Sequence, residues 1–269
     1  MTGVWALIRL SLRELAWQRA YLLLVVAAML FPWLLLIPTA LFLLDLGKVL
    51  VDMLFAIEHV LLSCFVFFLA SPLLSRDLDQ RLCHLWLTMP LSRAAYLVAR
   101  FLGTVLALLP LLCLFLVMAW MAGQLAAHLW PAYASTLHGA HMLVGGMLLV
   151  LPYVALLGLF YFIACASSGA AEALVFLLGG WLLSWAIPPV LQALRQAEVA
   201  AKTSPWIAQL IRALDFVVPD LSSARLALEV AHGQWPELHL LLPYMVEHLA
   251  YAVSGLLLAM LVFARRDLG

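Results

Sequence analysis

Two Glu-His pairs are the residues of this chain best suited to chemistry, because each pair interrupts a long apolar run. Glu58-His59 and Glu247-His248 each place a carboxylate beside an imidazole, groups that can hydrogen-bond, exchange a proton or bind a metal. Adjacent residues of a helix point about 100° apart, so the two members of a pair do not easily face one ion. Three interpretations are open: the polar lining of a substrate path or proton-sensitive site, structural hydrogen bonds, or a metal site made by both pairs. We take all four side chains as candidate path-lining residues and predict no metal site.

Motifs of known catalytic and nucleotide-binding sites are missing from the sequence. It contains no GxxxxGKS/T, HExxH, GxSxG or GxGxxG, so it has no phosphate-binding loop for ATP. The four cysteines lie in or beside apolar segments without CxxC spacing, which favours free thiols over a zinc site. His138 and His141 can share a helix face, but the aromatic residues around them are more simply an interfacial belt. We therefore expect no catalytic residue and no cofactor on this chain.

Composition indicates what surrounds these residues. The chain has 269 residues, of which 67% are hydrophobic and 10% charged, and its mean hydropathy is +1.11. An ordinary soluble domain is about 45–50% apolar and about 25% charged. The excess of apolar surface requires a lipid solvent, which excludes a soluble enzyme, a nucleic-acid-binding protein and a disordered tail. The formal net charge is +0, so bulk charge favours neither a polyanionic nor a cationic partner.

Long apolar runs predict an all-α polytopic membrane protein with about six transmembrane helices, because a helix needs about 20 apolar residues to cross a bilayer. The predicted spans are Tyr21–Leu44, Met53–Leu74, Tyr96–Gly123, Met142–Ala166, Ala173–Leu191 and Leu240–Ala264. Glu172 is expected to cap the fifth span near its N-terminus. Residues 1–19 repeat apolar positions at helical spacing, which predicts an amphipathic helix in the membrane interface. We expect residues 1–269 to form a single transmembrane domain.

Basic residues predict the orientation of these spans. One face of the membrane would carry Arg9, Arg13, Arg19, Arg76, Arg81, Arg93, Arg100, Arg265 and Arg266. The opposite face would carry Lys48 and a long segment with Arg195, Lys202, Arg212 and Arg225. Long loops have little influence under this rule, so both termini are predicted to be cytoplasmic.

Two segments outside the spans have patterns of their own. Residues 75–93 begin polar, continue amphipathic and end in Pro-Leu-Ser-Arg, which predicts a short cytoplasmic helix, a turn and re-entry into the third span. This segment is either a charged loop or a docking helix for a cytoplasmic partner. Residues 192–239 contain an apolar stripe that predicts an amphipathic helix at the outer interface, followed by a short helix near Ser223 to Val230. The stripe consists of Trp206, Ile207, Leu210, Ile211 and Leu214.

Segment 75–93 resembles the cytoplasmic coupling region of the ATP-binding-cassette type-2 permease family. The matching positions are Asp77 or Asp79, Leu82, Leu85, Leu87, Met89, Pro90, Leu91, Ser92 and Arg93. The terminal Phe263-Ala-Arg-Arg-Asp-Leu268 and the outer Val218-Pro-Asp-Leu-Ser-Ser are also similar to segments of that family. The N-terminal interfacial helix, the six spans, the long outer segment and the inside termini together extend the resemblance over the whole chain. Gln80-Arg81 stands where many members have a glycine before the leucine run, which leaves the geometry of this turn open.

The resemblance implies the membrane-spanning subunit of an exporter in the plasma (inner) membrane of a prokaryote. Two permease subunits would sit on two cytoplasmic ATPase subunits, which would bind ATP and Mg²⁺, and no nucleic acid would take part. The partner-coupling residues would be Arg76, Asp77, Asp79, Arg81, Leu82, Leu85 and Trp86. The stripe of the outer segment would form the outer gate. The alternatives are an intramembrane lipid-modifying enzyme, which needs a catalytic cluster, and a stand-alone secondary transporter, which often shows inverted repeats.

Overall fold

The structure is a computed structural model that describes residues 2–41, 46–79, 92–131, 139–194, 196, 204–217, 219–221 and 224–265. Within this part of the chain all regular structure is helical. The elements follow in the order α1 (Thr2–Ala16), α2 (Arg19–Leu34), α3 (Leu36–Thr39), α4 (Leu46–Phe65), the π-helical η2 (Val66–Ala70), α5 (Ser71–Asp79), α7 (Arg93–Leu129), α8 (Gly139–Ala166), α9 (Ala170–Leu194), α11 (Pro205–Val217), α12 (Ala224–Ala231) and α13 (Leu238–Arg265).

Six stretches of the described residues are long and apolar enough to cross a membrane. They are Arg19–Thr39, Leu46–Asp79, Arg93–Leu129, Gly139–Ala166, Ala170–Leu194 and Leu238–Arg265. They confirm the predicted all-α polytopic fold, with six spans in the predicted order. Most of these helices extend a few residues beyond the apolar run, because helical backbone hydrogen bonds continue through polar end residues. The predicted end of the first span, Leu44, lies outside the described residues.

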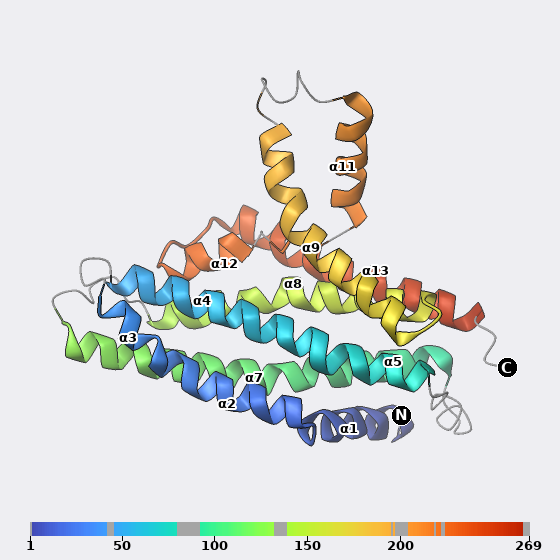
Figure 1. Cartoon of the computed structure of the whole chain (residues 1–269), viewed down its shortest axis with the longest axis horizontal. Coiled ribbons are helices and arrows are strands. Elements are labelled where there is room, and N and C mark those ends of the chain that lie inside the picture. The colour runs from blue at the N-terminus through green and yellow to red at the C-terminus, as the bar shows by residue number, and fades with distance from the viewer. Residues whose placement is uncertain are drawn as a thin grey trace.

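The spanning helices lie lengthwise beside one another in a bundle (Figure 1). The described chain begins and ends at the same end of this bundle, where α5 also ends and α7 begins (Figure 1). We call this the terminal end. An even number of spans returns the chain to the side on which it started, so the shared position of the two ends follows from the six crossings.

α8 is the most buried of the spans. Its sequence is apolar all round, and glycines stand where neighbouring helices approach. A Cβ at Gly145 would lie 2.5 Å from the carbonyl oxygen of Ala227 in α12, and a Cβ at Gly158 would lie 2.6 Å from that of Ala252 in α13. The missing side chains therefore allow α12 and α13 to pack directly on the backbone of α8.

α1 packs one face against α7. Leu7, Ile8 and Leu15 are buried, and a Cβ on Gly103 of α7 would lie 2.6 Å from the Cβ of Ser11. The predicted N-terminal helix is therefore present, but protein covers much of the apolar stripe that was expected to face the membrane interface.

The described residues of segment 192–239, predicted as an outer amphipathic region, include the end of α9, all of α11 and α12, and the start of α13. α9 extends to Leu194 and contains Pro188-Pro189, which lack two backbone donors and weaken the helix at that point. α11 lies beside the last part of α9, and the two project from the side of the bundle (Figure 1). α12 confirms the short helix predicted near Ser223 to Val230, and it packs on α8.

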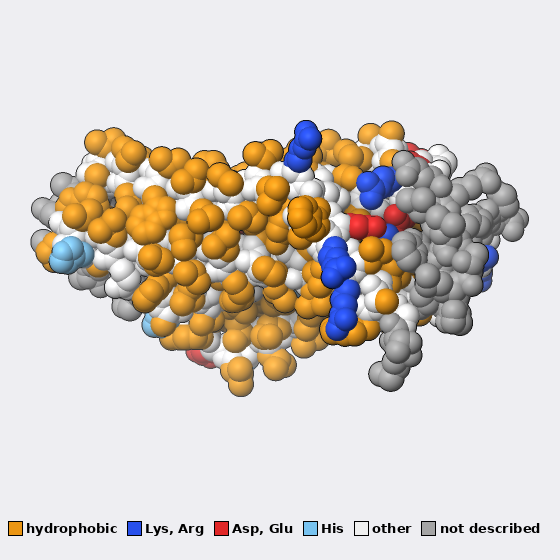
Figure 2. All heavy atoms as spheres, turned by 90° about the horizontal axis from the view of Figure 1, so that it is seen from below, with side chains coloured by type: hydrophobic (Ala, Val, Ile, Leu, Met, Phe, Trp, Pro, Cys, Tyr) orange, Lys and Arg blue, Asp and Glu red, His pale blue; other side chains and the backbone are white. Residues whose placement is uncertain are grey.

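The face of the molecule that carries α1 and α2 is covered by apolar side chains over most of its length (Figure 2). Lys and Arg side chains gather toward the terminal end of this face, next to Asp and Glu (Figure 2). A wide apolar band bordered by basic residues is typical of a membrane protein at the boundary between lipid and water.

Candidate functional site

A buried ion cluster around Arg100 lies at the terminal end of the bundle. The guanidinium is 1% exposed and contacts Asp77 of α5 through Nη2 and Glu14 of α1 through Nη1, each at 2.6 Å. Nη1 also donates to Ser11 Oγ at 3.0 Å, and the Tyr96 hydroxyl donates to Asp77 Oδ2 at 2.7 Å. The carboxylates of Asp77 and Glu14 and the hydroxyl of Ser11 replace much of the hydration that a buried arginine loses. The cluster therefore joins α1, α5 and α7.

Two further contacts tie the same region to α9 and α13. Asp79, the last residue of α5, accepts a hydrogen bond from the backbone N–H of Ala170 at 3.0 Å, at the start of α9. Arg93, the first residue of α7, donates to the carbonyl oxygens of Phe263 (3.2 Å) and Ala264 (3.1 Å), at the end of α13. A helix start presents free N–H groups and a helix end free carbonyls, so an acid suits the first and a base the second.

The two helices on either side of the α5–α7 connection (residues 80–91) are thus both anchored to the bundle. Asp77 and Asp79 anchor the flank formed by α5, and Arg93 and Arg100 anchor the flank formed by α7. These contacts reach α1, α9 and α13. A displacement of the connection would therefore reach helices in several parts of the bundle.

The structure corrects the expected environment of the partner-coupling residues. Asp77 is 1% exposed and pairs with Arg100, so its carboxylate does not face a partner protein as expected. Asp79 is exposed but already caps α9, whereas Arg76 is exposed. The other predicted coupling residues lie outside the described residues: Arg81, Leu82, Leu85 and Trp86.

Sequence reasoning placed Arg100 on this face of the membrane but did not predict its ion pairs, and it gave no role to Tyr96 or Glu14. Arg93, Tyr96 and Arg100 have the spacing of one helix face, which was a usable signal. An arginine on that face at the start of an apolar span needs a carboxylate nearby. The sequence offered several acids and did not indicate which would be the partner.

A polar cluster joins α4 and α8 farther along the bundle. His59 Nδ1 and Ser63 Oγ each lie 3.0 Å from the hydroxyl oxygen of Tyr153, which donates to the His59 carbonyl at 3.0 Å. A carbonyl oxygen only accepts, so the hydroxyl proton is used there, and His59 Nδ1 and Ser63 are the donors to Tyr153. A nucleophilic enzyme instead needs its hydroxyl to donate to a base. The cluster is therefore better suited to positioning or binding than to nucleophilic catalysis.

His59 also borders two hollows. One, of about 530 Å³, lies between α4 and α9 and is lined in part by Ser63, Trp181 and Trp185. The other, of about 290 Å³, includes Asp52 and shares His59 and Trp185 with the first. The rings of His59 and Trp185 meet edge to face with centroids 5.1 Å apart. This predicted path-lining residue therefore does face open space beside α9.

Replacing Tyr153 with Phe is expected to lower the free energy of unfolding by about 1–3 kcal/mol, because it leaves three polar groups of α4 without their partner. Tyr161→Phe is the matched control, since the Tyr161 hydroxyl contacts Thr104 Oγ1 at 3.1 Å. Thermal unfolding of the two purified variants in detergent measures the loss of stability in each. An equal or larger loss for Tyr161→Phe would contradict this account of the cluster.

Glu58 lies inside the bundle, away from the hollows that His59 borders. Its side chain is 2% exposed, and Gly146 of α8 leaves room for it, since a Cβ there would lie 3.0 Å from Glu58 Oε2. Oε1 has no hydrogen-bond partner among the described residues. The Glu-His pair is therefore divided between two environments, as the angle between adjacent helical residues predicts.

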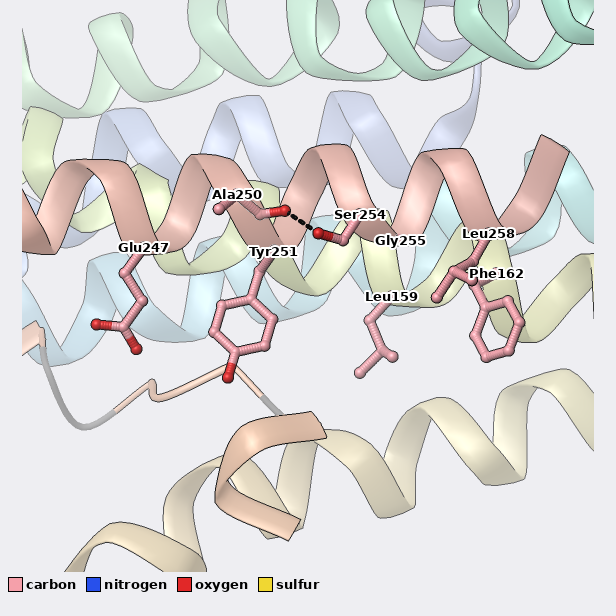
Figure 3. A pocket seen from close by; sticks show the side chains of 8 residues that line it. All are labelled: Leu159, Phe162, Glu247, Ala250, Tyr251, Ser254, Gly255 and Leu258. Atoms are coloured by element: carbon pink, nitrogen blue, oxygen red, sulfur yellow. Dashed lines mark hydrogen bonds between the residues drawn. The ribbon is translucent and has the colours of Figure 1, made fainter. Parts of the chain in front are cut away.

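Glu247 and His248 are divided in the same way. His248 is 1% exposed, and its ring nitrogens lie 2.7 Å from the carbonyl oxygen of Tyr244 and 3.3 Å from that of Asp220. These contacts connect α13 to the segment before α12, which favours the structural interpretation for His248. Glu247 is exposed and points into a groove of about 490 Å³ formed by α8 and α13 (Figure 3).

The predicted outer-gate residues lie on α11. Trp206 and Leu210 are exposed, Ile207 and Ile211 are half-buried, and the side chain of Leu214 lies outside the described part of the chain. Because α11 stands beside α9 at the side of the bundle, the apolar stripe does not cover the end of the bundle opposite the termini (Figure 1).

A metal site made by both Glu-His pairs has no counterpart in the part of the chain that the structure describes. There, no three His, Cys, Asp or Glu side chains are grouped to hold an ion. His141 instead lies near the Trp235 ring, with centroids 5.2 Å apart, and His138 is not among the described residues.

The chain matches no protein-family model and no curated protein.

Proposed function

We propose that this chain is the permease subunit of an ATP-driven exporter that works with a separate cytoplasmic ATPase. The observation that supports this proposal is the anchoring of both flanks of the α5–α7 connection. A partner bound to the connection would move α5 and α7 together. The contacts of Asp77, Asp79 and Arg93 would pass that movement to α1, α9 and α13.

The family resemblance supplies the rest of the assembly. Two permease subunits would sit on two ATPase subunits that bind ATP and Mg²⁺, in the plasma membrane of a prokaryote with both termini cytoplasmic. Few residues of α2, α9 and α13 are buried within the chain, which suits contact with lipid and with a second permease subunit. On α1, the exposed Trp5 and Arg9 would lie at the level of the lipid headgroups.

Two surfaces are the candidates for contact with substrate. One is the hollow between α4 and α9 at His59 and Trp185, and the other is the groove at Glu247. α11 would act as the outer gate once a second subunit faces it. In this mechanism ATP-driven closure of the ATPase pair would rock the permease pair and open a path between its subunits.

Replacing Asp79 and Arg81 together with Ala is expected to reduce recovery of the ATPase. The tagged native chain, purified from its native membranes, is expected to co-purify with an equal amount of a P-loop ATPase. Loss of two charged groups at the docking segment should weaken that association about tenfold, which corresponds to about 1.4 kcal/mol. Quantitative mass spectrometry of the purified complex measures the ratio of the two proteins.

Glu172→Gln is the control, because Asp79 also caps α9. The Glu172 carboxylate accepts hydrogen bonds from the backbone N–H and hydroxyl of Ser168 and so caps the same helix without belonging to the α5–α7 connection. It should leave recovery of the ATPase unchanged. Equal recovery from the double variant and the native chain would place the docking surface elsewhere, and absence of any ATPase would refute the proposal.

A further inference from the structure

The groove at Glu247 combines a single carboxylate with walls that are otherwise mostly apolar. Leu159 and Phe162 of α8 form one wall, and Ala250 and Leu258 of α13 contribute to the other (Figure 3). Its volume of about 490 Å³ falls in the usual range of ligand pockets, about 300–1,000 Å³. The groove has the size and composition of a site for a small amphipathic molecule.

The Glu247 carboxylate is the group in this groove that calls for a partner. It lies nine residues after the start of α13, about 14 Å along a helix that is long enough to span the bilayer. Among the described residues, no Lys, Arg or His side chain forms an ion pair with it. A carboxylate at that depth is costly unless it faces a cation or a polar cavity.

The charge of Glu247 is the main feature of the groove that would select one ligand over another. Ser254 Oγ donates to the carbonyl oxygen of Ala250, so its proton is already used (Figure 3). The Tyr251 ring projects to the same side of α13 as Glu247 (Figure 3). An aromatic face beside a carboxylate attracts a cation through both the ring quadrupole and the charge.

We propose that this groove binds a lipophilic organic cation, with the charged centre at Glu247 and Tyr251 and the apolar body against Leu159 and Phe162. Under the proposed function, such cations are the class of molecule that the transporter exports. The binding step itself does not require the ATPase, so the two proposals can fail separately.

Equilibrium binding of tetraphenylphosphonium to the purified full-length chain in nanodiscs of zwitterionic lipid tests this proposal. The expected result is saturable binding, with little binding of the neutral analogue triphenylphosphine oxide. Glu247→Gln should weaken tetraphenylphosphonium binding about tenfold, which corresponds to about 1.4 kcal/mol. Glu229→Gln, which changes an exposed carboxylate of α12, should leave it unchanged.

Ala250→Trp provides a second variant, because it fills the groove without removing the charge and should abolish binding. Equal binding by the native chain and Glu247→Gln, or equal binding of the charged and neutral probes, would overturn the proposal.

Discussion

Replacing Arg100 with Met is expected to destabilise the protein by about 3–5 kcal/mol. The substitution leaves Asp77, 1% exposed, as a buried carboxylate without its counter-charge, and it detaches Glu14 of α1 from α7. Thermal unfolding in detergent, followed by tryptophan fluorescence, should show a large fall in the midpoint. Recovery of folded protein should fall with it.

Two further variants separate the charge effect from the loss of packing. Glu14→Gln should lower the free energy of unfolding much less than Arg100→Met. The Glu14 side chain is 27% exposed, so water compensates part of the lost ion pair. Arg100→Met combined with Asp77→Leu removes both buried charges and should recover much of the lost stability. A double variant no more stable than Arg100→Met alone would show that the pairing of charge is not the reason for the loss.

Replacing Gly255 with Leu is expected to separate α8 from α13 and to destabilise the protein by about 3 kcal/mol or more. A Cβ at Gly255 would fall on the backbone carbonyl group of Gly158, and a Cβ at Gly158 would lie 2.6 Å from the Ala252 carbonyl oxygen. Backbone atoms cannot turn away as a flexible side chain can, so the helices must move apart. Thermal unfolding of Gly255→Ala and Gly255→Leu should show a graded loss.

Gly179→Ala is the matched control for this effect. A Cβ at Gly179 of α9 would meet no atom within 4 Å, so only the helix preference changes. Alanine is favoured over glycine inside a helix by about 0.5–1 kcal/mol, and this variant should be as stable as the native chain or slightly more stable. If Gly179→Ala and Gly255→Ala lost stability equally, close packing would not be the role of Gly255.

Local patterns in the sequence are sufficient to predict the helices of this protein and the order of its spans. The span Gly139–Ala166 could be predicted because a bilayer demands about 20 apolar residues and a helix satisfies its own backbone hydrogen bonds. The helices α11 and α12 could be predicted from amphipathic periodicity, and the cap of α9 by Glu172 from the preference of carboxylates for a helix start. Each depends on residues within a few turns of one another, so a local pattern contains the information.

Which side chains contact one another depends on the tertiary structure and could not be predicted from the sequence. Asp77 and Asp79 look alike in the sequence, yet one pairs with Arg100 inside the bundle and the other caps α9. Glu58 is buried beside α8, whereas Glu247 faces an open groove, although both follow the same Glu-His pattern. Contacts between residues far apart in the chain depend on how helices cross. In an all-apolar environment those crossings follow from backbone approach at glycines such as Gly158, which hydropathy does not encode.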